Sequence, residues 1–340
     1  MYTAYFGLNT KPFNITPDPA FLFMTEQHRE ALTGLTYSIL DRKGFVALSG
    51  TAGSGKTTML GWVLTKLSAS QVQSSVILNP SLTRDEFLEM VMLDFGICDI
   101  PTSKAQRLWM LQKFLVRGQQ EGKVNVLVID EAHKLTAELL EEIRLLGNFE
   151  CAQEKLIQVV LIGQSELDDL LNRPDLWQFK QRLSVRLSLQ PLGVNEVGHY
   201  VAHRWSVAGG KNPSPFSSDA IASLAKWSRG IPRVINSICD NALLEAFADT
   251  SSCVSVEHIH YAVRDLRLVD EKSLPTPPLS VPAAPVIPIA PPRVRQSSSG
   301  PLNVTASGPK RNQPLRVGLA NLDSHKTKSS INHRRSAVLG

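Results

Sequence analysis

Cysteine is scarce in this 340-residue sequence, and its four cysteines lie far apart, at Cys98, Cys151, Cys239 and Cys253. Structural zinc sites and disulfide scaffolds need closely spaced or paired cysteines, so the sequence excludes both. We therefore expect four buried free thiols in a reducing compartment.

Long apolar runs are missing as well. A membrane-spanning helix needs about 18 consecutive apolar residues, and the sequence contains no such run. The first residues, 1–6, lack a basic segment followed by an apolar stretch, so we expect no signal peptide. These two absences predict a cytoplasmic protein without an integral membrane segment.

Acidic residues are almost absent from the end of the chain. Residues 272–340 hold ten lysines and arginines and one acid, Asp323, whereas the rest of the chain holds 26 basic and 30 acidic residues. Eleven of the 21 prolines also lie in this stretch, and such a composition cannot bury enough apolar surface to offset chain entropy. We predict a disordered, Pro-rich basic tail over 269–340 that binds DNA phosphates, a membrane surface or nothing.

The first 30 residues combine prolines with aromatic residues, as in Pro12-Phe13 and Phe21-Leu22-Phe23. Disordered segments are poor in aromatic residues. We therefore predict an ordered N-terminal strap, 1–30, that lies on a core.

Beyond the strap, short apolar runs alternate with helical patterns up to residue 190. The runs suit buried parallel strands at 45–49, 75–78, 124–129, 158–162 and, more weakly, 184–189. This alternation predicts an α/β domain, 31–190, with a parallel sheet flanked by helices. Only helical patterns follow, at 194–208, 218–228, 233–248 and 256–266, and they predict a small all-helical domain, 191–268.

A phosphate-binding loop follows the first predicted strand and opens a helix, with the sequence Gly50-Thr51-Ala52-Gly53-Ser54-Gly55-Lys56-Thr57. Glycines let backbone N–H groups turn toward phosphates, and the helix N-terminus adds the positive end of its dipole. Lys56 is expected to reach the β- and γ-phosphates, and the Thr57 hydroxyl to bind Mg²⁺. We assign the next residue, Thr58, to the nucleotide site as well.

Two acids end the apolar strand at 124–129. Asp130 is placed to bind the metal, and Glu131 to polarise the attacking water. His133 completes an Asp-Glu-Ala-His tetrad, but helicase motifs do not follow it, so we interpret it as a structural loop residue. Gln164, at the end of the next strand, can hydrogen-bond the γ-phosphate or the water.

Three arginines are candidates for the charge that develops in phosphoryl transfer. Arg182, just before the fifth strand, is the first candidate for a finger that acts across a subunit interface, and Arg186 is the second. Arg233, in Gly230-Ile231-Pro232-Arg233, opens a helix of the small domain and is placed to sense the nucleotide. For the finger candidate Arg182, a surface salt bridge is the alternative.

The order of these motifs resembles that of the AAA+ ATPases, in which an α/β P-loop domain is followed by a helical lid. More narrowly, the chain resembles the ExeA/GspA type of general secretion pathway ATPase and its MshM-type pilus relatives. The likeness covers about residues 1–268 and rests on Tyr5-Phe6-Gly7-Leu8, Pro12-Phe13, Thr16-Pro17-Asp18-Pro19, Gln27-His28-Arg29-Glu30-Ala31-Leu32, Gly163-Gln164-Ser165-Glu166-Leu167 and Gly230-Ile231-Pro232-Arg233.

This resemblance implies Walker A, Walker B, sensor 1 and sensor 2 roles for Lys56, Thr57, Asp130, Glu131, Gln164 and Arg233, and the finger role for Arg182. It implies ATP and Mg²⁺ as ligands, and a homo-oligomeric ring or filament. Adenine follows from the family only, together with the absence of an Asn-Lys-x-Asp guanine motif.

The implied function is ATP-driven assembly of a secretion or type IV pilus-like envelope machine, by a cytoplasmic protein that is free or peripheral to the inner membrane. Longer relatives carry a transmembrane helix and a periplasmic peptidoglycan-binding domain, where this sequence has its basic tail. The module also resembles the TniB and TnsC helper ATPases of transposition, which bind DNA. A slowly hydrolysing nucleotide switch is the third alternative.

Overall fold

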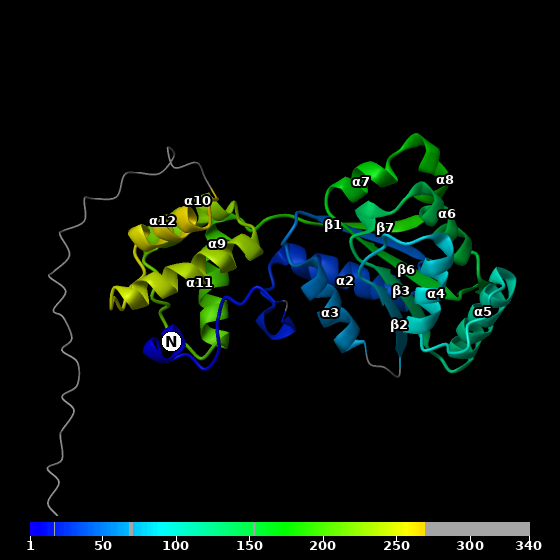
Figure 1. Ribbon diagram of the computed structural model, residues 1–340, viewed down its shortest axis with the longest axis horizontal. Helices are drawn as coiled ribbons and strands as arrows, with labels where there is room; N and C mark the ends of the chain where they lie inside the picture. Colours follow the sequence, from blue (N-terminus) through cyan, green and yellow to red (C-terminus); the bar gives the residue numbers. More distant parts are fainter. Residues whose placement is uncertain (17, 68–70, 152–153, 269–340) are drawn as a thin grey trace, which may run out of the picture. The chain divides into compact units, whose positions relative to one another are not determined.

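The computed structural model describes residues 1–16, 18–67, 71–151 and 154–268, so the predicted tail lies outside the described residues. Its centre is a five-stranded parallel sheet of order β2-β3-β6-β1-β7 (Figure 1). The strands are β1 (Phe45–Gly50), β2 (Val72–Ile77), β3 (Val124–Ile129), β6 (Ile157–Ile162) and β7 (Leu183–Leu189). This sheet confirms the predicted fold class.

The three inner strands, β1, β3 and β6, are buried along their whole length, which is why their sequences are almost continuously apolar. The edge strand β2 begins at Val72, three residues before the predicted start. Its polar Gln73 obscured the pattern, because this side chain hydrogen-bonds the buried Asn125 of β3 instead of facing water. A short antiparallel pair, β4 (Glu150–Cys151) and β5 (Glu154–Lys155), was not predicted.

Helices cover both faces of the sheet, as the sequence predicts (Figure 1). Successive residues of β3 alternate between them: Leu127 packs into one apolar cluster, whereas Val126 and Val128 pack into the other. The first cluster includes residues of α4 (Arg84–Asp94), α5 (Lys104–Gln120), α6 (Ala137–Leu146), α7 (Glu166–Leu171) and α8 (Trp177–Lys180), and the second includes residues of α2 (Glu26–Leu40) and α3 (Lys56–Lys66).

Four further helices form a lid with an apolar core of its own (Figure 1). They are α9 (Val194–Val207), α10 (Ser218–Ser228), α11 (Pro232–Ala248) and α12 (Val256–Asp265). Among the described residues, no helix is both long enough and apolar enough to cross a bilayer.

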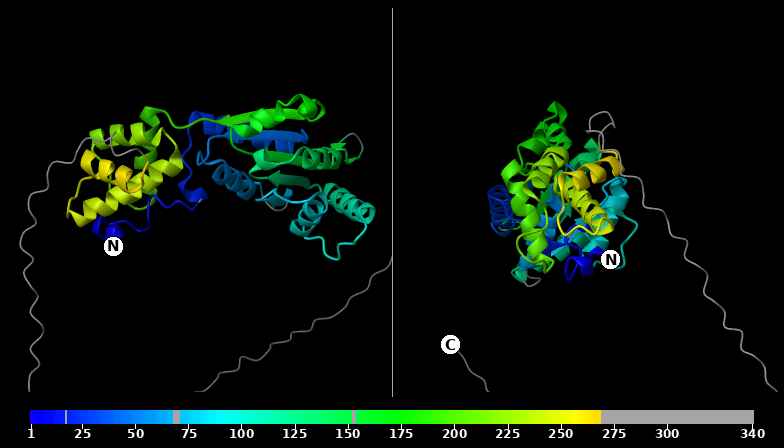
Figure 2. Two further views of the ribbon diagram at one scale, coloured as in Figure 1. Left: turned by 45° about the horizontal axis from the view of Figure 1, so that its top comes forward. Right: turned by 90° about the vertical axis from the view of Figure 1, so that its left-hand side faces the viewer.

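The N-terminal segment contributes to the core of the lid, where the side chains of Tyr2, Leu8 and Phe13 are buried. Its first helix, α1 (Tyr2–Tyr5), lies beside α11 (Figures 1 and 2). A short 3₁₀ helix, η1 (Pro19–Phe21), follows. The aromatic residues that set this segment apart in the sequence are therefore part of the lid.

A buried arginine of α9 joins the lid to this segment. The Arg204 Nε donates a hydrogen bond to the Pro12 carbonyl oxygen at 2.6 Å. Its guanidinium carbon also lies 4.7 Å from the centroid of the Phe21 ring, within the range of a cation–π contact. Buried charges are tolerated where donors are satisfied in this way.

The cysteines are free, but only Cys239 is buried. The expectation of buried thiols is wrong for the other three, which lie on exposed stretches at Cys98, Cys151 and Cys253. None of these three cysteines belongs to the two sheet clusters or to the lid core. Composition could not predict their exposure, because it does not tell which residues a core contains.

Substitution of Phe13 by alanine tests whether the N-terminal segment is part of the lid core. The Phe13 ring is 0% exposed, so Phe13→Ala should lower the free energy of unfolding by about 3–5 kcal/mol. Ile15→Ala is the control, because Ile15 is 52% exposed and should change this free energy by less than about 0.5 kcal/mol. Equal effects of the two substitutions in urea unfolding would contradict this packing.

Candidate functional site

In the loop between β1 and α3, two glycines adopt the left-handed backbone conformation. Gly53 has φ +78° and Gly55 has φ +96°, a conformation that side-chain-bearing residues rarely adopt. A Cβ on Gly53 would also lie 2.6 Å from the Cβ of Arg233. Gly55 has no side chain to cap α3, so the first N–H groups of that helix remain available to an anion.

Lys56 is held at the base of this loop. Its side chain is buried, and its Nζ donates hydrogen bonds to the carbonyl oxygens of Gly50 at 2.8 Å and Thr51 at 2.9 Å. Burial lowers the pKa of the Lys56 ammonium, while the nearby charges of Asp130 and Glu131 act in the opposite direction. A bound phosphate would add the negative charge that best stabilises this buried cation.

Two hard oxygen ligands meet beside the loop. The Thr57 hydroxyl donates a hydrogen bond to Asp130 Oδ2 at 2.8 Å, although the two residues are 73 positions apart in the chain. Mg²⁺ prefers one or two protein oxygens together with phosphate oxygens and water. The pair fits that preference, so these side chains could hold the metal of a nucleotide complex.

Glu131 occupies an unusual backbone position directly after Asp130. Its φ is +53°, in the left-handed region, and its N–H donates to Asp130 Oδ1 at 2.8 Å. Its carboxylate Oε2 lies 3.3 Å from Lys134 Nζ and 3.6 Å from His133 Nε2. Non-glycine residues in this region are often found at functional sites.

The end of β6 approaches the same place. Gln164 and Glu131 both line the cavity described below, and the backbone N–H of Gln164 donates to His133 Nδ1 at 3.3 Å. The tetrad histidine, which the sequence suggested was only structural, thus accepts a hydrogen bond from Gln164 and lies close to the predicted hydrolytic acid. The one sequence signal for this contact was its place three residues after Asp130.

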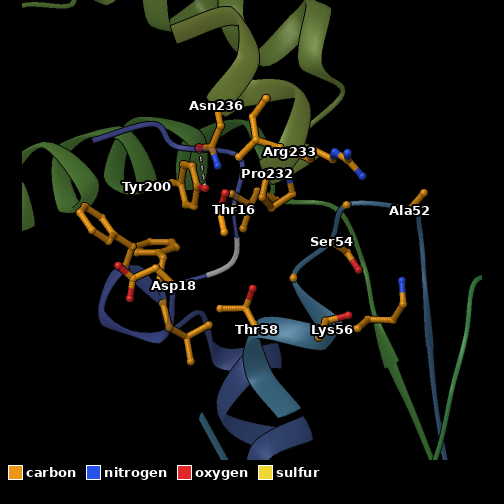
Figure 3. Close-up of a pocket in the computed structure, with 18 of the residues that line it drawn as sticks. Thr16, Asp18, Ala52, Ser54, Lys56, Thr58, Tyr200, Pro232, Arg233 and Asn236 are labelled. Carbon is orange, nitrogen blue, oxygen red and sulfur yellow. Dashed lines mark hydrogen bonds between the residues drawn. The ribbon is translucent and has the colours of Figure 1, made fainter. Parts of the chain in front are cut away.

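A cavity of about 480 Å³ joins the loop, the N-terminal segment and the lid (Figure 3). Eight of the predicted nucleotide-binding residues line it: Ala52, Gly53, Ser54, Gly55, Lys56, Thr57, Thr58 and Arg233. Three more predicted residues are hydrogen-bonded to this lining: Gly50 and Thr51 accept from Lys56, and Asp130 accepts from Thr57. The structure therefore brings these predicted residues together.

Arg233 enters the site from the lid, in the first turn of α11 (Figure 3). Its backbone N–H donates to the Gly53 carbonyl oxygen at 3.2 Å. Pro232 occupies the first position of α11, where a missing N–H has no cost to the helix. The lid thereby contacts the phosphate-binding loop through its backbone, and Arg233 is one of the residues that line the cavity.

The far side of the cavity is formed by residues that the sequence reasoning missed. The N-terminal segment contributes Thr16 and Asp18, and the lid contributes Tyr200 and Asn236 (Figure 3). The Tyr200 hydroxyl donates to Asn236 Oδ1 at 2.8 Å. Tyr200 and Asn236 carry no recognisable motif, because only the packing of α9 against α11 brings them together.

The two finger candidates lie elsewhere. Arg182 donates a hydrogen bond to Asn148 Oδ1, and Arg186 Nη1 donates to Asn172 Oδ1 at 3.2 Å. The described residues that line the cavity do not include either arginine. The geometry therefore does not favour a role of Arg182 or Arg186 in the nucleotide site of their own chain. Their role as a finger in the site of a neighbouring subunit stays a prediction.

Comparison with known proteins fits these observations. Residues 39–171 match the family model described as an AAA domain. Over 252 residues, the chain is 43% identical to general secretion pathway protein A of Aeromonas hydrophila. The chain therefore contains an AAA domain and is similar to general secretion pathway protein A. The match covers 73% of this chain and 45% of that protein, so the chain spans about half the length of this relative.

Solved structures support the fold of this AAA domain. The Aeropyrum pernix ORC2 protein in its ADPNP-ADP complexes has a TM-score of 0.58 at 16% identity, over 76% of this chain and 72% of that chain. Cdc6p of Pyrobaculum aerophilum has the same TM-score at 17% identity, over 76% and 74%. At these identities the likeness concerns the fold alone.

Substitution of the buried lysine tests whether the loop binds phosphates. ATP at 100 times its Kd should stabilise the wild-type protein by about 2.7 kcal/mol, seen as a rise in Tm. Lys56→Met should abolish this rise, because a neutral side chain cannot pair with the phosphates. Lys66→Met, at the exposed end of the same helix, should keep it. A full ATP-dependent rise in the Lys56→Met protein would contradict the site.

Proposed function

We propose that this AAA ATPase binds ATP with Mg²⁺ in the cavity and hydrolyses it to drive assembly of a secretion or type IV pilus-like envelope machine. One observation carries the chemical part: Lys56, the Thr57–Asp130 pair and Glu131 converge on a cavity that Arg233 of the lid also enters. This set combines phosphate binding, metal binding and a base for water.

In this proposal the triphosphate lies along the loop and the start of α3. Lys56 exchanges its contacts with loop carbonyl oxygens for phosphate oxygens, and its charge becomes fully compensated. Thr57 and Asp130 hold Mg²⁺, which neutralises charge on the β- and γ-phosphates when it is bound. Since the lid contacts Gly53 through Arg233, nucleotide bound at the loop can alter the position of the lid.

Glu131 supports hydrolysis in addition to binding. Its carboxylate accepts a proton from water as the water oxygen attacks the γ-phosphorus, and the bond to the bridging oxygen of ADP breaks. Gln164, at the same edge of the sheet, orients the water or the γ-phosphate. The base and sugar are proposed to lie toward Thr16 and Tyr200, on the far side of the cavity.

The proposed complex is a homo-oligomer in which Arg182 of one subunit completes the site of the next. Arg182 and Arg186 lie outside the cavity of their own chain, which a trans-acting residue requires. The similarity to general secretion pathway protein A supports the envelope role, and in this proposal the protein works on the cytoplasmic side of the envelope, free or at the inner membrane.

Replacement of the proposed base tests the hydrolytic step. Glu131→Gln should keep ATP affinity within about threefold and lower turnover by on the order of 10²-fold or more, because the amide cannot accept the proton. Phosphate release and the ATP-dependent rise in Tm measure the two properties. Glu138→Gln, on the exposed side of α6, is the control and should leave both unchanged. Wild-type turnover in the Glu131→Gln protein would contradict the mechanism.

The same substitution tests the envelope role in cells. A strain whose only copy carries Glu131→Gln should fail to assemble the secretin multimer of its secretion or pilus system, whereas Glu138→Gln should support assembly. Normal secretin multimers in the Glu131→Gln strain would contradict an ATP-driven assembly role but leave the ATPase proposal standing.

Mixing of two inactive proteins tests the trans arginine. Arg182→Ala and Lys56→Ala should each lose most turnover alone, yet their mixture should regain part of it. In mixed oligomers, an intact loop of the first protein can meet an intact arginine of the second. Arg186→Ala in place of Arg182→Ala is the matched control. Rescue with neither arginine would leave both as surface residues.

A further inference from the structure

His133 lies between two parts of the proposed hydrolytic site. It belongs to the 3₁₀ turn η2 (Ala132–Lys134), and this turn begins directly after Glu131. The His133 side chain is 13% exposed, compared with 37% for the Glu131 side chain. Its two ring nitrogens face different partners. Nδ1 is 3.3 Å from the backbone N of Gln164, and Nε2 is 3.6 Å from Glu131 Oε2.

The contact with Gln164 decides which nitrogen of the neutral ring carries the proton. A backbone N–H can only donate, so His133 Nδ1 accepts and must be unprotonated. The ring proton is then on Nε2, which faces the Glu131 carboxylate. At 3.6 Å this pair is too long for a hydrogen bond, but a small shift of either side chain would form one.

The end of β6 and the turn that carries His133 are packed tightly together. A Cβ on Gly163 would lie 3.1 Å from the His133 backbone N and 2.9 Å from the Leu167 Cβ. Glycine is therefore what permits the close approach. Because α7 also packs on η2, a displacement of the β6 end cannot leave the turn unchanged.

The other cation near Glu131 is less suited to fix its position. Lys134 Nζ lies 3.3 Å from the same carboxylate oxygen, but the lysine side chain is 51% exposed. Exposed ion pairs contribute little to stability and fix the positions of their side chains only weakly. The histidine is less exposed and is held by the hydrogen bond from Gln164, so it is the better positioned neighbour of the Glu131 carboxylate.

We propose that His133 is a positioning residue that transmits the position of the β6 end, where Gln164 lies, to the Glu131 carboxylate. The inference rests on the proposed ATP hydrolysis and adds a coupling within that site. A γ-phosphate or water that engages Gln164 would shift the β6 end, and His133 would bring Glu131 into line with the attacking water.

Two substitutions separate the two ends of the ring. The carbonyl oxygen of His133→Asn can replace Nδ1 and keep the bond to Gln164, but this side chain is too short to reach Glu131. The amide of His133→Gln can reach the place of Nε2. Because the coupling needs both contacts and each variant keeps only one, we expect kcat to fall on the order of 10- to 100-fold in His133→Asn and in His133→Gln.

ATP affinity and Tm distinguish positioning from a general structural role. Both should stay close to the wild-type values in His133→Asn, so that only kcat changes. His199→Asn, an exposed histidine of α9, is the matched control and should leave kcat unchanged. If His133→Asn does not fold, His133→Gln provides the second test, with the same fall in kcat expected.

Two results would overturn the proposal. One is wild-type kcat in a folded His133→Asn or His133→Gln protein. The other is a fall in ATP affinity as large as the fall in kcat, which would indicate structural damage to the whole site. Failure of the proposed function is a distinct outcome, because the wild-type protein would then lack turnover before any substitution is made.

Discussion

Parallel pairing of β3, β6 and β1 is the constraint on which the site depends. Leu48 of β1 pairs with Ile162 of β6, and Ile129 of β3 pairs with Leu161, so the three strands end level with one another. Since parallel strands end at one edge of a sheet, the phosphate loop, the Asp130–Glu131 pair and Gln164 emerge side by side. The apolar packing of both faces keeps this edge in register, because a shift by one residue would move every side chain of a strand to the opposite face of the sheet and disrupt both clusters.

The lid and the N-terminal segment complete the cavity that begins at the edge of the sheet. Arg204 fastens the segment to α9, and Arg233 contacts the loop through its backbone N–H. The cavity is thus lined by the N-terminal segment, the phosphate-binding loop and the lid, and the lid lies more than a hundred residues after the loop in the chain. Only the loop among them is fixed by the sheet, so nucleotide-dependent movement of the lid would also carry the segment that packs in its core.

Sequence patterns predicted best where the chemistry is local. The phosphate-binding loop needs glycine at positions of positive φ and a lysine at the start of a helix, so consecutive residues reveal it. Gln73 shows the opposite case, since a polar residue in an edge strand conceals the strand until its partner Asn125 is known. Tyr200 and Asn236 could not be predicted either, because their place in the cavity depends on helix packing.

By itself, the sequence determined the fold class, the phosphate-binding loop and the acids that accompany it, because periodicity and short motifs follow from local geometry. Tertiary structure alone decided that the aromatic N-terminal segment belongs to the lid core, and that Arg182 lies outside its own cavity. It also decided that His133 stands between Gln164 and Glu131. Contacts of this kind join residues far apart in the chain, and they exist only once the sheet and the lid have packed.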